Sequence, residues 1–244
     1  MRCLVPSFSV LMAALAAGTA LAGSNDDPWQ KNVTLLAIPS ATVAPSGLVF
    51  TSLSAPTNGD NASAAIGVGF GDATDGIGLQ LTSVVSAPAN GLDSSGYFSL
   101  RGSARIGQGA TPVYLGIGAD HIGIWGDTPD RDVGLTAMLT AFPVLTAANS
   151  GNRYPMMVTL GGGTHVRNGD TDPGLFLGAG IGLSESIGVS AAWSGDSFDI
   201  GASFRPANID NMRISAVVTD AFDSDDNQRL TLSFSWFFNN MFGG

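Results

Sequence analysis

The feature that most constrains this chain is a two-residue alternation of apolar with small or polar side chains along nearly its whole length. From Leu175 to Phe204 nearly every second residue is apolar, and mostly Gly, Ala, Ser and Asp stand between them. Successive side chains of a β-strand point to opposite faces of a sheet, so this period indicates strands with one apolar face. The chain is therefore expected to be all-β.

About twelve segments follow this pattern, and most are about 9 to 12 residues long, the length that a tilted strand needs to cross a bilayer. Strands of soluble sandwiches are usually shorter, near 5 or 6 residues. The expected strands are 46–55, 62–71, 76–87, 96–107, 112–122, 132–143, 154–167, 174–183, 187–195, 197–205, 211–220 and 228–238.

The charged residues favour short connections over helices. The acids are Asp except for Glu185, and the bases are Arg except for Lys31; Asp is typical of turns, whereas Glu and Lys favour helices. The 33 Gly and 12 Pro support the same conclusion. With 10 Lys and Arg against 20 Asp and Glu, the chain lacks the basic surface that nucleic acid binding requires.

Residues 1–22 have the features of a cleaved signal peptide. Arg2 precedes a mainly apolar stretch, and the small-residue triplet Ala20-Leu21-Ala22 marks a cleavage site. The single cysteine of the chain, Cys3, would leave with this segment, so the mature protein cannot depend on disulfides. No later apolar run has the length of a membrane helix.

Periodicity alone does not say which way the apolar face points. It faces a core in a soluble sandwich and faces lipid in an outer-membrane barrel. Strand length and the runs of small residues on the opposite face, such as Gly178, Gly180 and Gly182, favour a narrow closed barrel, where they leave room in the lumen. The prediction is an antiparallel up-and-down transmembrane β-barrel of about 12 strands (10 to 14) over residues 46–244, after an N-terminal periplasmic segment, 23–45.

Two short stretches carry family resemblances. The final strand, "RLTLSFSWFF", resembles the terminal strand by which the barrel-assembly machinery recognises bacterial outer-membrane barrels, through Phe234, Trp236 and Phe238; here "NNMFGG" follows it. Residues 38–54 resemble the first-strand entry of YjbH-like barrels associated with bacterial exopolysaccharide, through Pro39, Ser40, Ala41 and Gly47. The whole chain is similar to small, uncharacterised outer-membrane proteins of Gram-negative bacteria, which implies that location.

Charged residues on the polar face are the candidate functional residues. They would attract an anionic solute or polysaccharide, or fill a closed lumen with a structural network of Arg and Asp; the second interpretation is favoured because so small a barrel has little free space. The candidate lumen-facing residues are Arg101, Arg105, Asp120, His165, Arg167, Asp199, Arg205, Arg213 and Arg229.

No pattern indicates catalysis, a metal or a cofactor. The two histidines, His121 and His165, lack the spacing to serine that barrel phospholipases show. Clustered Asp residues fit turn chemistry, and the glycine runs lie inside expected strands, away from any strand-to-helix turn. The predicted function is a non-enzymatic barrel in outer-membrane lipid, structural or a narrow channel, linked to export of surface polysaccharide. Two alternatives stay open: a barrel enzyme acting on lipid or peptide, and a secreted β-sandwich that binds carbohydrate.

Overall fold

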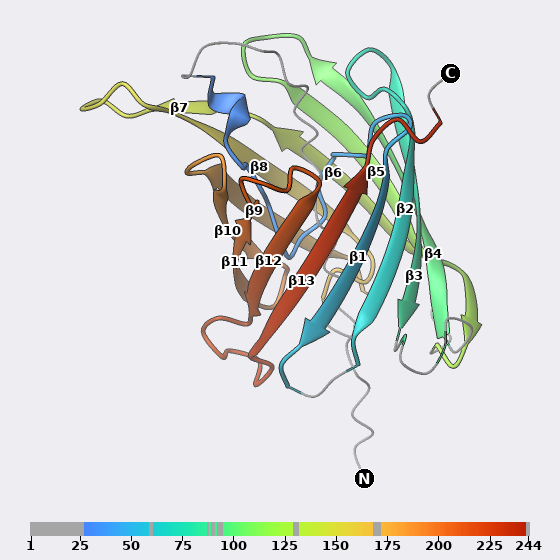
Figure 1. Cartoon of the computed structure of the whole chain (residues 1–244). Coiled ribbons are helices and arrows are strands. Elements are labelled where there is room, and N and C mark those ends of the chain that lie inside the picture. The colour runs from blue at the N-terminus through green and yellow to red at the C-terminus, as the bar shows by residue number, and fades with distance from the viewer. Residues whose placement is uncertain are drawn as a thin grey trace.

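The strands of the protein form one closed antiparallel barrel (Figure 1). A computed structural model describes residues 27–58, 61–86, 88, 91, 95–128, 132–167 and 172–242; the expected signal peptide, 1–22, lies outside them. The strands are β1 (Val49–Pro56), β2 (Ser63–Gly71), β3 (Ile77–Ser86), β4 (Ser95–Gly107), β5 (Val113–Gly126), β6 (Gly134–Ala141), β7 (Val144–Thr146), β8 (Arg153–Gly163), β9 (Gly174–Gly182), β10 (Ile187–Trp193), β11 (Phe198–Phe204), β12 (Met212–Thr219) and β13 (Arg229–Phe238).

Each strand of the barrel pairs with its neighbours in the chain, as in an up-and-down barrel. Closure occurs between the first and last strands, where Val49 of β1 lies opposite Phe238 of β13. β6 pairs directly with β8, so twelve of the described strands form the ring and β7 stands outside it. The expected closed barrel of about 12 strands is confirmed.

The β6–β8 connection differs from the expectation of one strand over 132–143 and a short loop after it. β6 ends at Ala141, and the chain resumes at Val144 as β7, which pairs with the start of β8 in a hairpin that projects beyond the barrel (Figure 1). Pro143 lies in the gap; it has no amide proton for the ladder, so the strand breaks there.

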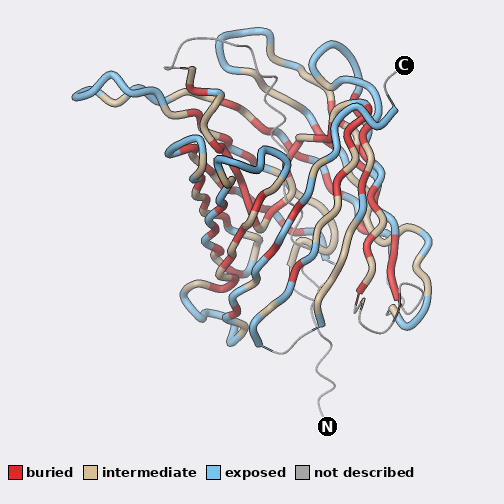
Figure 2. The backbone as a smooth tube through the Cα atoms, viewed as in Figure 1, coloured by how far each residue is buried: buried red, intermediate tan, exposed pale blue. Residues whose placement is uncertain are grey.

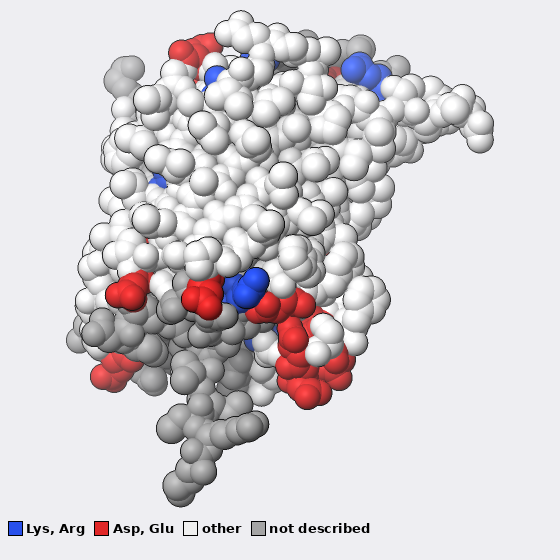
Figure 3. Space-filling model, turned by 180° about the vertical axis from the view of Figure 1, so that it is seen from behind, with Lys and Arg blue, Asp and Glu red and all other residues white. Residues whose placement is uncertain are grey.

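The outer face of the barrel is apolar at the level of the strands. Along β13, for example, Phe234 and Trp236 are about half exposed, whereas the intervening Ser233 and Ser235 are buried. Buried and exposed positions alternate along the tube in Figure 2, and the charged residues in Figure 3 gather mainly toward the two ends of the barrel. The apolar face therefore points outward, which rules out the soluble β-sandwich. Within the described residues, no helix has the length and hydropathy to cross a membrane.

Residues 27–48, which we name the plug, lie inside the barrel. Leu35, Leu36 and Ala41 of the plug are fully buried. Its backbone amides donate to inward-facing side chains of the wall: Leu36 N to Ser190 Oγ (3.2 Å), Ala41 N to Thr140 Oγ1 (2.8 Å) and Ala44 N to Gln80 Oε1 (2.9 Å). We expected residues 23–45 ahead of the barrel in the periplasm; the described part, 27–45, lies in the lumen, and the compartment that it faces stays a prediction.

The hydrophobic core of the protein lies between the plug and one part of the inner wall. Plug residues Val33, Leu35, Ile38 and Ala41 form one cluster with Met138, Phe142, Met157, Phe176 and Ala192 of the wall region. A second cluster joins Ala44 and Leu48 to Phe50. The inner face is therefore not uniformly small or polar, because the apolar side chains of the plug need apolar partners.

The inner-face glycines allow the plug to approach the wall closely. A Cβ atom at Gly180 would overlap the carbonyl oxygen of Thr34, and one at Gly188 would overlap that of Asn32. A Cβ at Gly69 would overlap the carbonyl oxygen of Ala44. The space that these glycines leave in the lumen is therefore occupied by the polypeptide backbone of the same chain.

Candidate functional site: the lumen and its mouth

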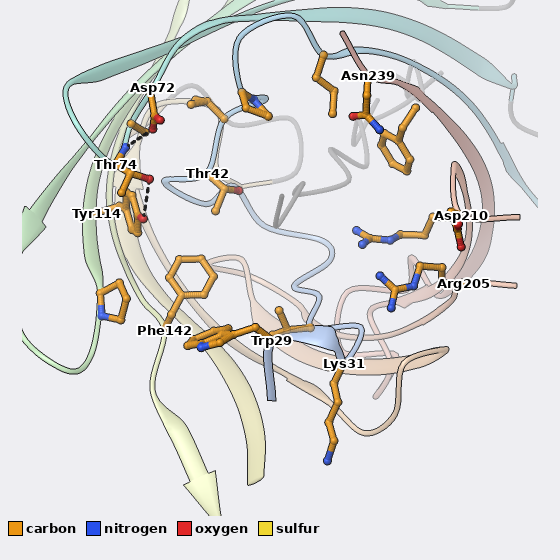
Figure 4. A pocket seen from close by; sticks show the side chains of 18 of the residues that line it. Trp29, Lys31, Thr42, Asp72, Thr74, Tyr114, Phe142, Arg205, Asp210 and Asn239 are labelled. Atoms are coloured by element: carbon orange, nitrogen blue, oxygen red, sulfur yellow. Dashed lines mark hydrogen bonds between the residues drawn. The ribbon is translucent and has the colours of Figure 1, made fainter. Parts of the chain in front are cut away.

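A cavity of about 560 Å³ opens between the plug and the wall, at the end of the barrel where β1 begins and β13 ends (Figure 4). We name it the mouth cavity. The plug contributes Trp29, Lys31 and Thr42 to its lining, and the wall and its connections contribute Asp72, Thr74, Tyr114, Phe142, Arg205, Asp210, Arg213, Phe237 and Asn239, among others. This volume is within the range of small-molecule pockets.

Two arginines form a cationic side of the mouth cavity. Arg205, just after β11, donates from Nη2 to the carbonyl oxygen of Gln30 at 2.7 Å. Arg213, near the start of β12, is buried, and its guanidinium carbon lies 5.9 Å from the ring centroid of Phe237. The two guanidinium charges repel each other electrostatically, so an anion between them would relieve an unfavourable interaction.

Aromatic rings and hydroxyl groups lie across the mouth cavity from Arg205 (Figure 4). Trp29 and Phe142 pack edge to face with centroids 6.5 Å apart, and Tyr114 packs on Phe142 at 5.7 Å. The Tyr114 hydroxyl lies 3.5 Å from Thr74 Oγ1, and Thr74 N donates to Asp72 Oδ1 at 2.7 Å. Neither the aromatic group nor its position in a cavity was predicted from the sequence.

Arg101 and Arg105, on β4, both donate hydrogen bonds to backbone carbonyl groups, and the partner of Arg101 belongs to the plug. The buried Arg101 donates from Nη1 to the carbonyl oxygen of Ser40 at 3.4 Å and is attracted electrostatically by Asp120. Asp120 accepts a hydrogen bond from Ser99 Oγ at 2.5 Å. Arg105 is half-buried and donates from Nε to the carbonyl oxygen of Gly107 at 2.9 Å. Arg101 thus contacts the plug directly, in agreement with a lumen that is filled.

The remaining predicted charges, Arg167, Asp199 and Arg229, lie at the opposite end of the barrel. Arg167 forms a partly exposed salt bridge with Asp196, at 3.6 Å between Nε and Oδ1. The buried Asp199 accepts hydrogen bonds from Ser197 Oγ (3.2 Å) and Asp220 N (2.9 Å). The buried Arg229 donates to Asn227 Oδ1 at 2.8 Å. The structure thus separates these three residues from Arg205 and Arg213 at the mouth cavity.

Asp220, just after β12, organises the loop that follows, whereas the sequence predicted it only as the last residue of the expected strand 211–220. Burial raises the pKa of its carboxyl group, but hydrogen bonds from Ser224 N, Ser224 Oγ, Asp225 N and Asn227 N outweigh burial and leave the pKa below its ordinary value. Its φ of +51° is a left-handed conformation that Asp tolerates. The β12–β13 loop is therefore organised around one ionised side chain.

The two histidines form an aromatic group at the same end. The ring of His121 stacks on Tyr97 with centroids 4.2 Å apart, and the ring of His165 lies 5.8 Å from that of His121. This is a packing arrangement and does not resemble a nucleophile held beside a base. Over the described part of the chain, no three His, Cys, Asp or Glu residues are grouped so that they would hold a metal ion.

The C-terminal strand presents Phe234, Trp236 and Phe238 on the outer face, each between a third and a half exposed. β13 closes the barrel by pairing with β1, and Met241 N donates to the carbonyl oxygen of Gly47 at 2.9 Å just beyond the strand. The predicted recognition of this strand by the assembly machinery stays a prediction.

Comparisons with known proteins agree with the fold. No family model matches the chain, and no curated protein matches it. Among solved structures the chain is similar to the KdgM porin in complex with disordered oligogalacturonate, with 11% sequence identity, a TM-score of 0.50, and coverage of 79% of this chain and 99% of that one. It is also similar to the outer membrane protein Omp33 of Acinetobacter baumannii, with 14% identity, a TM-score of 0.45, and coverage of 78% and 97%.

The closed ring of twelve antiparallel strands and its apolar exterior define a transmembrane β-barrel of the outer-membrane type. The likeness to the KdgM porin places the chain among barrels with a porin-like fold.

Proposed function

We propose that the protein is a non-enzymatic outer-membrane barrel that forms a narrow channel, whose path is controlled by the plug. The observation that carries the proposal is a closed, lipid-facing barrel with a segment of its own chain in the lumen. Wall contacts to the plug are hydrogen bonds and van der Waals contacts, such as Ser103 Oγ to the carbonyl oxygen of Ala41 at 2.5 Å. A noncovalent plug of this kind can shift without unfolding the wall.

The solute of the proposed channel is anionic. Arg205 and Arg213 line the mouth cavity, and Arg101 lies deeper in the lumen beside the plug. The KdgM porin, which has a similar fold, was solved with oligogalacturonate, an anionic oligosaccharide. A link to surface polysaccharide, with outer-membrane lipid and the barrel-assembly machinery as partners, agrees with this and with the short resemblance to YjbH-like barrels.

A purely structural role is the second candidate. It is favoured by the complete burial of Leu35 and Ala41, since a plug that never moves would leave no path for solutes.

A reversible cross-link between plug and wall tests the channel. A Cβ built at Gly201 lies 3.0 Å from Leu36 Cβ, a little closer than the roughly 3.8 Å of a disulfide, so Leu36→Cys with Gly201→Cys can form one after a small shift. If the signal peptide is removed as predicted, the mature chain has no other cysteine. In planar bilayers we expect the oxidised double variant to be silent and its reduced form to conduct like wild type.

The single variant Leu36→Cys is the matched control, because it loses the same packing without forming the bond. Heat-modifiable migration on gels verifies that each protein is folded. Equal conductance of the oxidised and reduced forms would show that the plug does not control the path. Folded wild-type protein that never conducts would favour the structural role.

A further inference from the structure

We infer that the mouth cavity binds an acidic saccharide, a short sugar chain that carries a carboxylate and free hydroxyl groups. The inference deepens the proposed function, because it names the class of solute and the place where the solute is held. Three sets of lining groups carry it: a pair of arginines, a set of aromatic rings, and a polar side of hydroxyl and carboxylate oxygens.

The arginine pair suits a carboxylate. A guanidinium group has five N–H donors in a planar fork that matches the two oxygens of a carboxylate. Arg205 donates from Nη2 to the neutral carbonyl oxygen of Gln30, which uses one of the N–H groups of its guanidinium. Arg213 is held in place by burial and by its position over Phe237, so its guanidinium group is oriented before a ligand arrives.

The basic and acidic residues that line the mouth cavity are equal in number, so their net charge does not select an anion. Selection of an anion depends on where the charges lie. Lys31, Arg205 and Arg213 are balanced by Asp27, Asp72 and Asp210. The Lys31 amine points away from the cavity in Figure 4 and donates to the carbonyl oxygen of Arg153 at 2.8 Å. Figure 4 shows Arg205 on one side of the cavity, with Asp210 near it, and Asp72 on the opposite side. Arg213 is close enough to Arg205 for the two charges to interact.

The side opposite the arginines suits the rest of a sugar. Asp72 can accept hydrogen bonds from sugar hydroxyls, and the hydroxyls of Thr74 and Tyr114 can both donate to them and accept from them. Trp29, which is 38% exposed, provides a flat apolar surface on which the C–H face of a sugar ring can pack, and the buried Phe142 packs edge to face against it. A simple inorganic anion would use the arginines and leave these groups without a role.

Calorimetric titration of the folded protein in detergent micelles tests the inference with trigalacturonate, maltotriose as the neutral chain of the same length, and citrate as a non-sugar polyanion. We expect wild type to bind trigalacturonate at least tenfold more tightly than either of the others. Arg205→Gln and Arg213→Gln should each weaken trigalacturonate binding at least tenfold, and Trp29→Ala should weaken trigalacturonate binding but not citrate binding.

Arg153→Gln is the matched control, because Arg153 is exposed at the same end of the barrel and does not line the cavity. If Arg213→Gln fails to fold, the half-buried Arg205 decides the result alone. Absence of trigalacturonate binding by wild type, unchanged binding by Arg205→Gln, or equal affinity for citrate or maltotriose would each overturn the inference. Binding in micelles does not require an open path through the barrel. A protein that binds trigalacturonate but never conducts would therefore support the binding site and contradict the proposed channel.

Discussion

Two parts of the inner wall have the same alternation of small or polar with apolar residues, but their inward residues face different things. On β9 and β10 the inward residues include Gly178, Gly180, Gly182 and Gly188, whereas on β12 and β13 they include Arg213, Ser215, Ser233 and Ser235. The glycine side lies against the plug backbone. On the serine and arginine side, wall residues bond to one another, as Ser54 Oγ does with Ser233 Oγ at 2.8 Å.

Small inward residues therefore have two distinct roles in this narrow barrel: they either make room for the plug or form hydrogen bonds within the wall. Glycine admits a second backbone, and no larger residue can replace it without moving that backbone. Serine fills its own space and forms hydrogen bonds across the sheet. Substitutions on the glycine side should therefore have larger effects than those on the serine side.

The largest effect is expected for Gly180→Val. Valine has a higher strand propensity than glycine, so the local preference alone would predict a more stable β9. We expect the opposite, a loss near the upper end of the ~1–3 kcal/mol that overpacking usually costs, because the new side chain meets the plug backbone at Thr34. The temperature of the gel-mobility shift and the rate of proteolysis within the plug measure it.

Gly109→Val is the control for this substitution, because nothing lies within 4 Å of a Cβ at Gly109. If the two valine variants behave alike, the glycine side is not specialised for the plug.

Asn32→Ala tests the contact between the plug and the glycine side of the wall from the side of the plug. Asn32 is buried, and its side-chain amide donates to Ser203 Oγ at 3.0 Å and to Ser186 O at 3.1 Å. Loss of these bonds leaves their partners unsatisfied, at a cost of about 2 kcal/mol. We expect faster proteolysis of the plug in Asn32→Ala and little change in Asn152→Ala, where the replaced residue is exposed. If the plug of Asn32→Ala is as resistant to proteolysis as that of wild type, these hydrogen bonds do not hold the plug.

Asp220→Asn tests the loop at the end of β12 through its pH dependence. Because the folded pKa of Asp220 lies below its ordinary value, its ionised form stabilises the fold above the unfolded pKa, and this contribution is lost as the pH falls through the folded pKa. Asparagine tolerates the same backbone but cannot accept all four hydrogen bonds. The melting temperature of wild type should be the higher one at pH 7, and the two should approach each other as the pH falls from about 3.9 through the lower folded pKa. A difference in melting temperature that does not change with pH would show that the ionised carboxylate is not what stabilises the loop.

The smallest effect is expected for Ser233→Ala, on the serine side. It removes a hydrogen bond between two wall residues, Ser233 and Ser54, so a loss of about 1 kcal/mol or less should appear in thermal unfolding. Plug proteolysis should not change, and an increase would show that this side also holds the plug.

The fold was largely predictable because alternation is a local property. The pattern of Leu230, Leu232 and Phe234 against Arg229, Thr231 and Ser233 places one face outward once the strands are long enough to span a bilayer. The hairpin at β7 was not predicted, because a strand of three residues, Val144–Thr146, is too short to show an alternation.

The site was much less predictable, since it depends on contacts between distant residues. The parity of Arg205 and Arg213 predicted that they face inward, but nothing local shows that Gln30 lies beside one of them. The inner glycines indicated free space in the lumen, but nothing in the sequence indicated that the plug fills it. The alternating pattern begins after the plug. Nothing in the sequence around Leu35 or Ala41 indicates that these residues pack against the barrel wall.

The position of the plug also has a consequence for the order of folding. Asn32 bonds to Ser203, 171 residues later in the chain, whereas the sheet grows mainly by pairing neighbouring strands. Contacts of such long range form late and slow folding. Asn32 lies in the plug and Ser203 on β11, so the plug gains this partner only after β11 has been made and paired. Docking of the plug is therefore expected to be a late step of folding, near the pairing of β1 with β13 that closes the ring.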